Sequence, residues 1–575
     1  MKNQKRIMLI GSVAAVVIAL VVVTIVLINK YTPSKEVMPL TDYMEVASDE
    51  ATIVFHDGYY EKKAMFLDGQ VYVDFDTVKT KFNPKFYWDN TENLLIYTTS
   101  VSVIKATAGD NFYRVNKSKT DTGYQIVKTT GSEVYVALDY IKLFSNIDYR
   151  FYEEPNRVYI DYEWGNDYLY SAVQEDTQVR FKPDIKSEIL EEVKVGDRLL
   201  HIDTSETIED DFIKVMTEDG IIGYAREKYL KDGEYETLTS DYVPESYSHI
   251  LKDEKINMVF HQVFSTAEND EVLNELNATK GVTTICPTWF TVTGEQGELS
   301  SLASENYVER AHNAGVEVWA LVTDIAEDPV DMSKLLPVTS RREKLINELV
   351  SYAIKLNLDG LNIDFENVPA RCGEDFIQFL RELSVKCRNN GIILSVDNFV
   401  PTEYTAFYNR KEQGEIVDYV VVMAYDEHYG GSEEAGSTSS ISWVQQGIDK
   451  TLEEVPKEQV IIAIPFYTRL WEEEKKKNGE IELSSSAYGM YSSLNLIEDY
   501  GVTPKWDSTL KQNYAEFPGT NAEGKEVTYK IWLEDDKSIE AKMQAIEAAE
   551  VAGVAEWKLG IEKESVWDII LKYVN

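Results

Sequence analysis

Eight short apolar segments alternate with amphipathic stretches from about residue 250 to the end of the 575-residue chain. The segments begin at Lys255, Gly281, Gly315, Leu358, Gly391, Val417, Val460 and Gly553. Each is the length of one buried strand, and the stretches between them, such as 340–356, repeat apolar residues every three or four positions as a helix does. Eight strand and helix units predict an α/β fold, a (β/α)8 TIM barrel over 250–575.

The longest break in this alternation, near 471–535, separates the last two predicted strands. It is longer than a simple crossover requires. We expect an inserted subdomain there that walls one side of a cleft.

The fourth segment, LDGLNIDFENV over 358–368, places acids in a strand that should be buried. Apolar and polar residues alternate in it with the period of a strand, so one face is apolar and the other carries Asn362, Asp364 and Glu366. In a barrel of this class the reactive groups lie where strands end at the carboxyl face. We therefore expect these three side chains to point into the mouth of the barrel.

The string DGLNIDFE resembles the D-G-x-x-x-D-x-E signature of glycoside hydrolase family 18. The string MAYD, which starts at Met423, resembles the sixth-strand motif of that family, and Trp557 stands where the family keeps an aromatic floor under the sugar. The strings NIDFENV, MAYDEHY, IPFYTRLW and AEWKLG look closest to the branch of cortex-lytic N-acetylglucosaminidases of spore-forming bacteria. The resemblance covers the barrel and is not visible in the first 250 residues.

Cleavage of a glycosidic bond needs a carboxyl group that stays protonated near neutral pH, and Glu366 is the predicted general acid. Asp364 lies two residues back on the same face of the same strand, about 6.6 Å away, a position too local for the opposing carboxylate of an ordinary two-acid site. The resemblance implies substrate-assisted retaining catalysis instead. Asp364 would then orient the 2-acetamido group of the sugar, and Tyr425 and Asp426 would hold that group.

Asn362 departs from the pattern of the family, because many members carry Asp at this position. An amide cannot share a proton with Asp364, so the ionisation of Asp364 and the pH optimum are expected to differ. We assign Asn362, Met423 and Trp557 to substrate binding and Glu366, Asp364, Tyr425 and Asp426 to catalysis.

The N-terminus carries Lys2, Lys5 and Arg6 before a charge-free apolar run over 7–28, which is long enough to cross a bilayer. No convincing small-x-small cleavage site follows. Residues 1–30 are therefore predicted to be a retained transmembrane signal-anchor, with 31–41 a linker. The basic residues before the span place the rest of the chain on the extracytoplasmic side of a cell membrane.

Two small domains are expected between the anchor and the barrel. Residues 42–165 hold an internal repeat, 70–98 against 133–161, and resemble the small α/β stalk domain named after the N-terminal region of copper amine oxidases. Residues 166–240 hold short strands broken by Gly and Asp, and resemble a bacterial SH3-like all-β barrel, a module that often contacts peptidoglycan. A plain packing spacer is the alternative for this second domain.

Charge and cysteine content exclude several functions. A net charge of −42, from 57 basic and 99 acidic residues, argues against nucleic acid as a partner. The three cysteines do not form a disulfide framework, and the six histidines show no zinc-site spacing. We expect neither a metal nor another cofactor.

The sequence thus predicts a membrane-anchored glycosidase, an N-acetylglucosaminidase or chitinase-like enzyme. Its partner would be a polysaccharide containing β-linked N-acetylglucosamine, with wall contact through the SH3-like domain. Peptidoglycan, spore cortex and chitin oligomers all carry this sugar, so the sequence does not choose among them. The alternative is a non-catalytic glycan-binding or structural cell-wall protein on a family 18 barrel.

Overall fold

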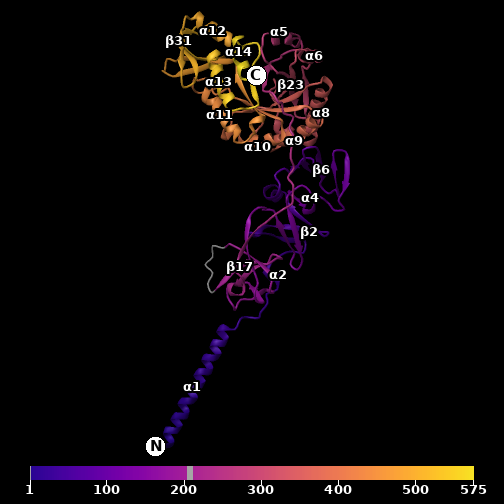
Figure 1. Ribbon diagram of the computed structural model, residues 1–575, viewed down its shortest axis with the longest axis vertical. Helices are drawn as coiled ribbons and strands as arrows, with labels where there is room; N and C mark the ends of the chain where they lie inside the picture. The colour runs from indigo at the N-terminus through magenta and orange to yellow at the C-terminus, as the bar shows by residue number, and fades with distance from the viewer. Residues whose placement is uncertain (1, 204–210, 575) are drawn as a thin grey trace. The chain divides into compact units, whose positions relative to one another are not determined.

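The structure, a computed structural model, describes residues 2–203 and 211–574. The chain divides into two compact units, which are described separately (Figure 1). Unit 1 comprises Met1–Phe86 and Ala106–Pro244, and unit 2 comprises Tyr87–Lys105 and Glu245–Asn575.

Eight parallel strands close into a barrel in unit 2, in the order β20, β21, β23, β24, β25, β26, β27, β33. Pairing of β20 with both β21 and β33 closes the ring. The strands are β20 (Ile256–His261), β21 (Thr284–Gly294), β23 (Glu317–Thr323), β24 (Gly360–Asp364), β25 (Ile393–Phe399), β26 (Tyr419–Met423), β27 (Val460–Pro465) and β33 (Gly553–Trp557). The predicted TIM barrel is confirmed, strand by strand.

Helices form an outer ring around these strands (Figure 1). They are α5 (Val272–Asn277), α6 (Glu305–Asn313), α7 (Met332–Leu335), α8 (Thr339–Leu356), α9 (Gly373–Asn389), α10 (Arg410–Ile416), α11 (Ile441–Leu452), α13 (Asp536–Ala548) and α14 (Ser565–Val574). α8 shows why they form: its buried residues recur every three or four positions on one face, and Asn357 ends it in the left-handed conformation. The helices therefore bury one face against the strands.

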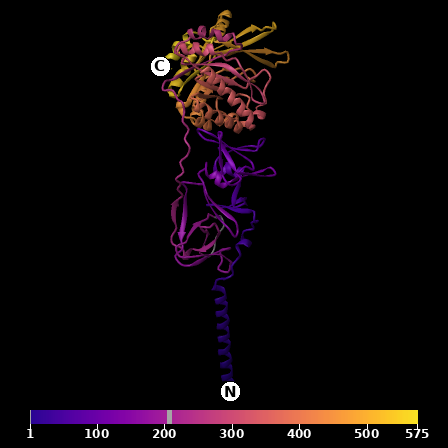
Figure 2. The ribbon, with the colours of Figure 1, turned by 90° about the vertical axis from the view of Figure 1, so that its right-hand side faces the viewer.

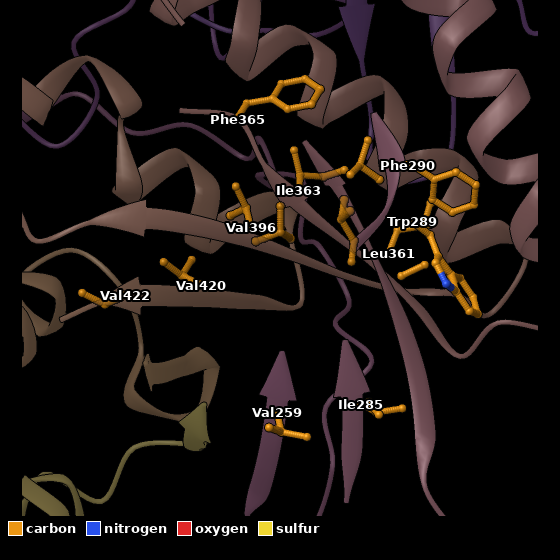
Figure 3. Close-up of a cluster of buried hydrophobic side chains, with 14 of the residues drawn as sticks. Val259, Ile285, Trp289, Phe290, Leu361, Ile363, Phe365, Val396, Val420 and Val422 are labelled. Atoms are coloured by element: carbon orange, nitrogen blue, oxygen red, sulfur yellow. The ribbon is translucent and has the colours of Figure 1, made fainter. Parts of the chain in front are cut away.

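Strand periodicity divides the apolar core of unit 2 into two layers. Leu361 and Ile363 of β24 point outward with Val396, Val420 and Val422 of the next two strands, into the layer between strands and helices (Figure 3). A smaller cluster, which includes Met258, Phe260, Trp319 and Tyr419, fills the inside of the barrel. Inward positions of β24 are therefore left for Asn362 and Asp364.

An antiparallel sheet is inserted in the chain between β27 and β33, which still pair directly in the barrel (Figure 2). Its order is β29, β28, β32, β31, β30, and α12 (Met490–Asp499) packs on it. The strands are β28 (Tyr467–Lys475), β29 (Ile481–Gly489), β30 (Lys505–Asp507), β31 (Gln512–Thr520) and β32 (Glu526–Leu533). The segment 460–471, read from the sequence as one strand, is two: β27 ends at Pro465 and β28 begins at Tyr467. Another short strand, β22 (Glu298–Ser301), pairs with the end of β21.

A hairpin from the repeat region also belongs to unit 2. Its strands β4 (Tyr87–Asp89) and β5 (Leu94–Thr98) pack on the start of α8 and on α9. Asp89 is buried, and its Oδ2 accepts the backbone N–H of Thr339 at 2.7 Å and the hydroxyl of Thr339 at 2.6 Å. Asp89 thus caps α8, whose own N-cap residue, Val338, supplies no side-chain cap.

Unit 1 contains the other copy of this hairpin, β11 (Asp148–Tyr152) and β12 (Arg157–Asp161), in a seven-stranded sheet. The order is β11, β12, β1, β2, β3, β10, β9, with β1 (Glu50–Phe55), β2 (Gly58–Leu67), β3 (Gln70–Asp74), β9 (Val127–Thr130) and β10 (Glu133–Ala137). Equivalent strands of the two repeats, β3 and β10, pair directly, with Val73 opposite Val136. The short helix α4 (Leu138–Lys142) follows β10, as α3 (Phe75–Thr77) follows β3.

A second sheet of unit 1 is also seven-stranded, in the order β15, β14, β18, β17, β16, β13, β19. Its strands are β13 (Asp167–Ala172), β14 (Thr177–Arg180), β15 (Ile189–Val193), β16 (Arg198–His201), β17 (Phe212–Met216), β18 (Ile222–Arg226) and β19 (Glu234–Thr237), all paired antiparallel. The N-terminal helix α1 (Lys2–Tyr31) has a mean hydropathy of 3.0 over its most apolar window. It is long and apolar enough to cross a membrane, although a signal sequence would share these properties.

Candidate active site

A cavity of about 370 Å³ opens at the carboxyl ends of the barrel strands. It brings together six of the seven predicted site residues: Asp364, Glu366, Met423, Tyr425, Asp426 and Trp557. Asn362, the seventh, is buried two residues before Asp364, on the same face of the same strand. Asp397 and Tyr467, which the sequence reading did not single out, line the cavity too.

Glu366 follows the end of β24 and is held there through its backbone. The buried carboxylate of Asp324, just after β23, accepts the backbone N–H of Glu366 at 2.9 Å and that of Asn367 at 2.9 Å. The hydroxyl of Tyr408 donates to the carbonyl oxygen of Phe365 at 2.8 Å. These bonds fix the chain where the strand ends and leave the Glu366 side chain in the cavity.

Asn362 joins the floor of the site to the next strand. Its Nδ2 donates to Oδ1 of Asp397 at 2.8 Å and to the hydroxyl of Ser395 at 2.9 Å. Oδ1 of Asn362 and Oδ1 of Asp364 are buried without a hydrogen-bond partner among the described residues. Asp364 itself lines the cavity beside Glu366.

Burial and the crowding of carboxyl groups raise the pKa values of the acids in the site. Burial, then the charges of Asp324 and Asp426, raise the pKa of Glu366 to about 7. Burial raises the pKa of Asp397 to about 8, against the lowering effect of the Asn362 hydrogen bond. Burial and the neighbouring Asp397 raise the pKa of Asp364 well above its ordinary range. The site therefore holds protons near neutral pH, as a general acid requires.

Tyr425 and Asp426 follow β26, and the inserted sheet positions the second of them. The hydroxyl of Tyr467, the first residue of β28, donates to Oδ1 of Asp426 at 2.6 Å. Asp426 has a positive φ of 54°, a conformation that turns the chain sharply after the strand. Nε1 of Trp443 donates to the carbonyl oxygen of Tyr425 at 3.2 Å. The loop that carries both residues is thus tied from two sides.

Trp557 ends β33, which is four strands from β24 in either direction around the ring. Its ring packs against Phe260 inside the barrel at a centroid distance of 5.4 Å. An aromatic face therefore lies across the cavity from the acids of β24, where it can support the apolar face of a sugar ring.

The residues that sequence reading missed have weak local signals. Asp397 lies on the inward face of β25, two residues after Ser395, and Asp324 follows β23 directly; a polar residue at either place is visible once the strands are drawn. Tyr467 gave no such signal, because it sits on the inserted sheet. Among the described residues, no group of three His, Cys, Asp or Glu side chains is arranged to hold a metal ion.

Comparison with known proteins agrees with this geometry. The model of the family described as glycosyl hydrolases family 18 matches residues 243–562, which is more than half of the chain. The glycosylase YvbX of Bacillus subtilis (strain 168) is 24% identical over 292 residues, covering 48% of this chain and 81% of that protein. The cortical fragment-lytic enzyme of the same organism is 25% identical over 240 residues, or 41% of this chain and 54% of its own length.

Solved structures show the same fold. The C-terminal domain of a protein named as a chitinase, from Desulfitobacterium hafniense DCB-2, superposes with a TM-score of 0.50 at 24% identity, covering 56% of this chain and all of that domain. The barrel, its cavity and the family match lead to one conclusion. The chain belongs to family 18 of the glycosyl hydrolases.

Proposed function

We propose that the protein is a glycoside hydrolase that cleaves glycans containing β-linked N-acetylglucosamine by substrate-assisted, retaining catalysis. The observation that carries the proposal is Glu366, a carboxyl group with a pKa raised to about 7, in one cavity with Asp364 and an aromatic floor. A protonated carboxyl at a sugar-sized cavity is what cleavage of a glycosidic bond requires.

Glu366 gives its proton to the leaving glycosidic oxygen while the acetamido oxygen of the substrate attacks the anomeric carbon. The bond to the leaving sugar breaks, and a cationic oxazolinium ring forms on the substrate. The carboxylate of Asp364, which lines the cavity, accepts the acetamido N–H and stabilises the developing positive charge. Water then loses a proton to the Glu366 carboxylate and attacks the anomeric carbon, which opens the ring with retained configuration.

Tyr425 and Asp426 bind the acetamido group in this mechanism, and Trp557 and Met423 contact the sugar ring. Asn362 acts indirectly, through the hydrogen bond that it donates to Asp397. The names of relatives support two substrate classes, because one is a cortical fragment-lytic enzyme and another, from Drosophila melanogaster, is a probable chitinase. We place peptidoglycan and cortex glycans ahead of chitin oligomers.

Substitution of the two acids tests this proposal. Glu366→Gln keeps the shape and removes the proton, so kcat on N-acetylglucosamine oligomers should fall about 10²–10⁴-fold while binding persists. Asp364→Asn should also slow turnover, and it should bind an N-acetylglucosamine thiazoline, a mimic of the oxazolinium, more weakly than the wild type. Near-normal hydrolysis by Glu366→Gln, with products read by mass, would refute the assignment. Glycan binding without hydrolysis by the wild type would support a non-catalytic wall protein instead.

We also propose that α1 anchors the chain in the cell membrane with everything after it outside. The apolar helix and the basic residues Lys2, Lys5 and Arg6 before it support this orientation. The repeat region and the all-β region would contact or span the wall, as the stalk-like and SH3-like resemblances imply. Protease added to intact protoplasts should digest the barrel, and full protection would overturn this topology.

A further inference from the structure

Lys558 contacts two of the residues that line the cavity. Lys558 follows Trp557 at the end of β33, and its Nζ donates to Oε1 of Gln262 at 2.5 Å. The same Nζ lies 5.6 Å from the centroid of the Phe264 ring. Gln262 and Phe264 both line the cavity, and Phe264 is 70% exposed, so its ring is open to a bound glycan.

Lys558 is a cation without a counter-ion. Among the described residues no carboxylate lies within 4.0 Å of its Nζ, whereas Lys280, Lys334 and Lys457 each pair with Asp or Glu. Glu268, whose charge raises the pKa of Lys558, already accepts the backbone N–H of Phe264 at 2.7 Å and the hydroxyl of Ser265 at 3.3 Å. Lys558 is half-buried, and burial lowers its pKa, which an added anion would reverse.

The charged residues that line the cavity are all acidic. The lining residues include four carboxyl groups, Asp364, Glu366, Asp397 and Asp426, and no basic side chain. A negatively charged substituent on a substrate would find no cationic partner among these lining residues, so a cation to meet it has to come from beside the cavity. Lys558 follows the last residue of β33, the strand opposite β24 in the ring, and so lies apart from the acids of β24.

We propose that Lys558, together with Gln262 and Phe264, forms a rim subsite for a carboxylate borne by the amino sugar next to the cleaved N-acetylglucosamine. This inference rests on the proposed function and narrows its substrate class. The preferred glycan carries an acid-ended substituent, as a muramic acid residue with a free lactyl carboxylate does, whereas chitin is neutral. Lys558 donates to the carboxylate, Gln262 orients the lysine, and Phe264 supports the sugar that bears the acid.

Three tetrasaccharides test the subsite with the full chain. They are an alternating N-acetylglucosamine and N-acetylmuramic acid oligomer, the same oligomer with its lactyl carboxyls amidated, and chitotetraose. The wild type should show a kcat/KM ratio of acidic over amidated oligomer of about ten, which should shrink as salt is raised. Lys558→Met should bring that ratio close to one, and Lys558→Arg should keep most of it.

Lys280→Met is the matched control, because Lys280 is an exposed lysine that precedes β21 at the opposite end of the barrel and pairs with Asp568. It removes the same charge and should leave the ratio unchanged. Equal losses on all three substrates in Lys558→Met, or an unchanged ratio, would overturn the subsite. A wild type that hydrolyses none of the three would refute the proposed function itself, which is a distinct result.

Discussion

The side-chain amide of Asn362 on β24 donates to Oδ1 of Asp397 on β25 at 2.8 Å. A neutral amide and an acid thus join these two strands beneath the cavity. A carboxyl at position 362 would place three acids in this dry space, with Asp364 above and Asp397 beside it. The amide therefore limits the number of protons that the site must share.

Asn362→Asp is expected to shift the acidic limb of the pH profile of kcat/KM to higher pH. The new carboxyl adds a like charge, which raises the pKa of Asp364, and Asp364 must be ionised to stabilise the oxazolinium. Ser395→Ala is the control, because it removes the other hydrogen-bond partner of Asn362 without adding charge. An acidic limb that stays in place would contradict the proposed coupling between these acids.

The alkaline limb should report Glu366. Its pKa is raised to about 7, and only the protonated form donates, so kcat/KM should fall about tenfold per pH unit well above pH 7. Linkage predicts a matching trend in stability. The ordinary pKa of Glu is about 4.3, so the folded state binds the proton more tightly, and this contribution is present below about pH 4.3 and lost as pH rises through 7. Urea unfolding of the wild type and Glu366→Gln at pH 5 and pH 8 measures it; a wild type that gains more stability than the variant on going to pH 8 would contradict the sign.

Tyr467→Phe should lower kcat by about 10- to 100-fold, because it removes the hydrogen bond that holds the Asp426 carboxylate. The fold should be unaffected, since the ring remains. Tyr514→Phe is the matched control: the Tyr514 hydroxyl donates to Glu516 at the same 2.6 Å on the same inserted sheet, away from the cavity. Equal activity of the two variants would show that Tyr467 only packs.

Glu556→Met should stabilise the protein by about 1–3 kcal/mol at neutral pH. Glu556 is fully buried on the outward face of β33, level with Val259 and Ile464, and neither carboxyl oxygen has a partner among the described residues. Burial raises its pKa well above the ordinary value, so the wild type should lose stability as pH rises above about 4.3. The variant should show less of this decline. Glu547→Met, at an exposed glutamate of α13, should show neither effect in the same unfolding series.

Asp89→Ala should lower the free energy of unfolding of the barrel unit by about 2 kcal/mol, because α8 loses the carboxylate that caps its first residue, Thr339. The guanidinium of Arg342, which pairs with Glu382 at 2.9 Å and lies 4.9 Å from the Tyr87 ring centroid, depends on the same hairpin. A chain that starts at residue 245 should therefore unfold at a lower temperature than the full chain. Asp121→Ala, at an exposed position of β8 (Ser118–Asp121), should change little in the same thermal scan.

Periodicity and spacing were sufficient to predict the eight barrel strands, and the family resemblance added to them predicted six of the residues that line the cavity. Strand alternation placed Asp364 inside the barrel without any structure, because a strand sends successive side chains to opposite faces. The same reasoning could not place Tyr467, whose position depends on where one strand ends and the inserted sheet begins. Nor could it foresee Asp89, which acts on Thr339 across 250 residues of sequence. Contacts of that range leave no local pattern.

That distance along the chain also bears on how the protein is made. Asp89 is synthesised 250 residues before Thr339, and at about 5–20 residues per second the delay is roughly 12–50 s. Local elements form in microseconds, so β4 and β5 are able to pair long before the helix that covers them exists. During this interval the face of the hairpin that later packs on α8, with Tyr87 and Asp89, is exposed to chaperones, proteases and other nascent chains. This face is therefore protected only after α8, in the C-terminal half of the chain, has been synthesised.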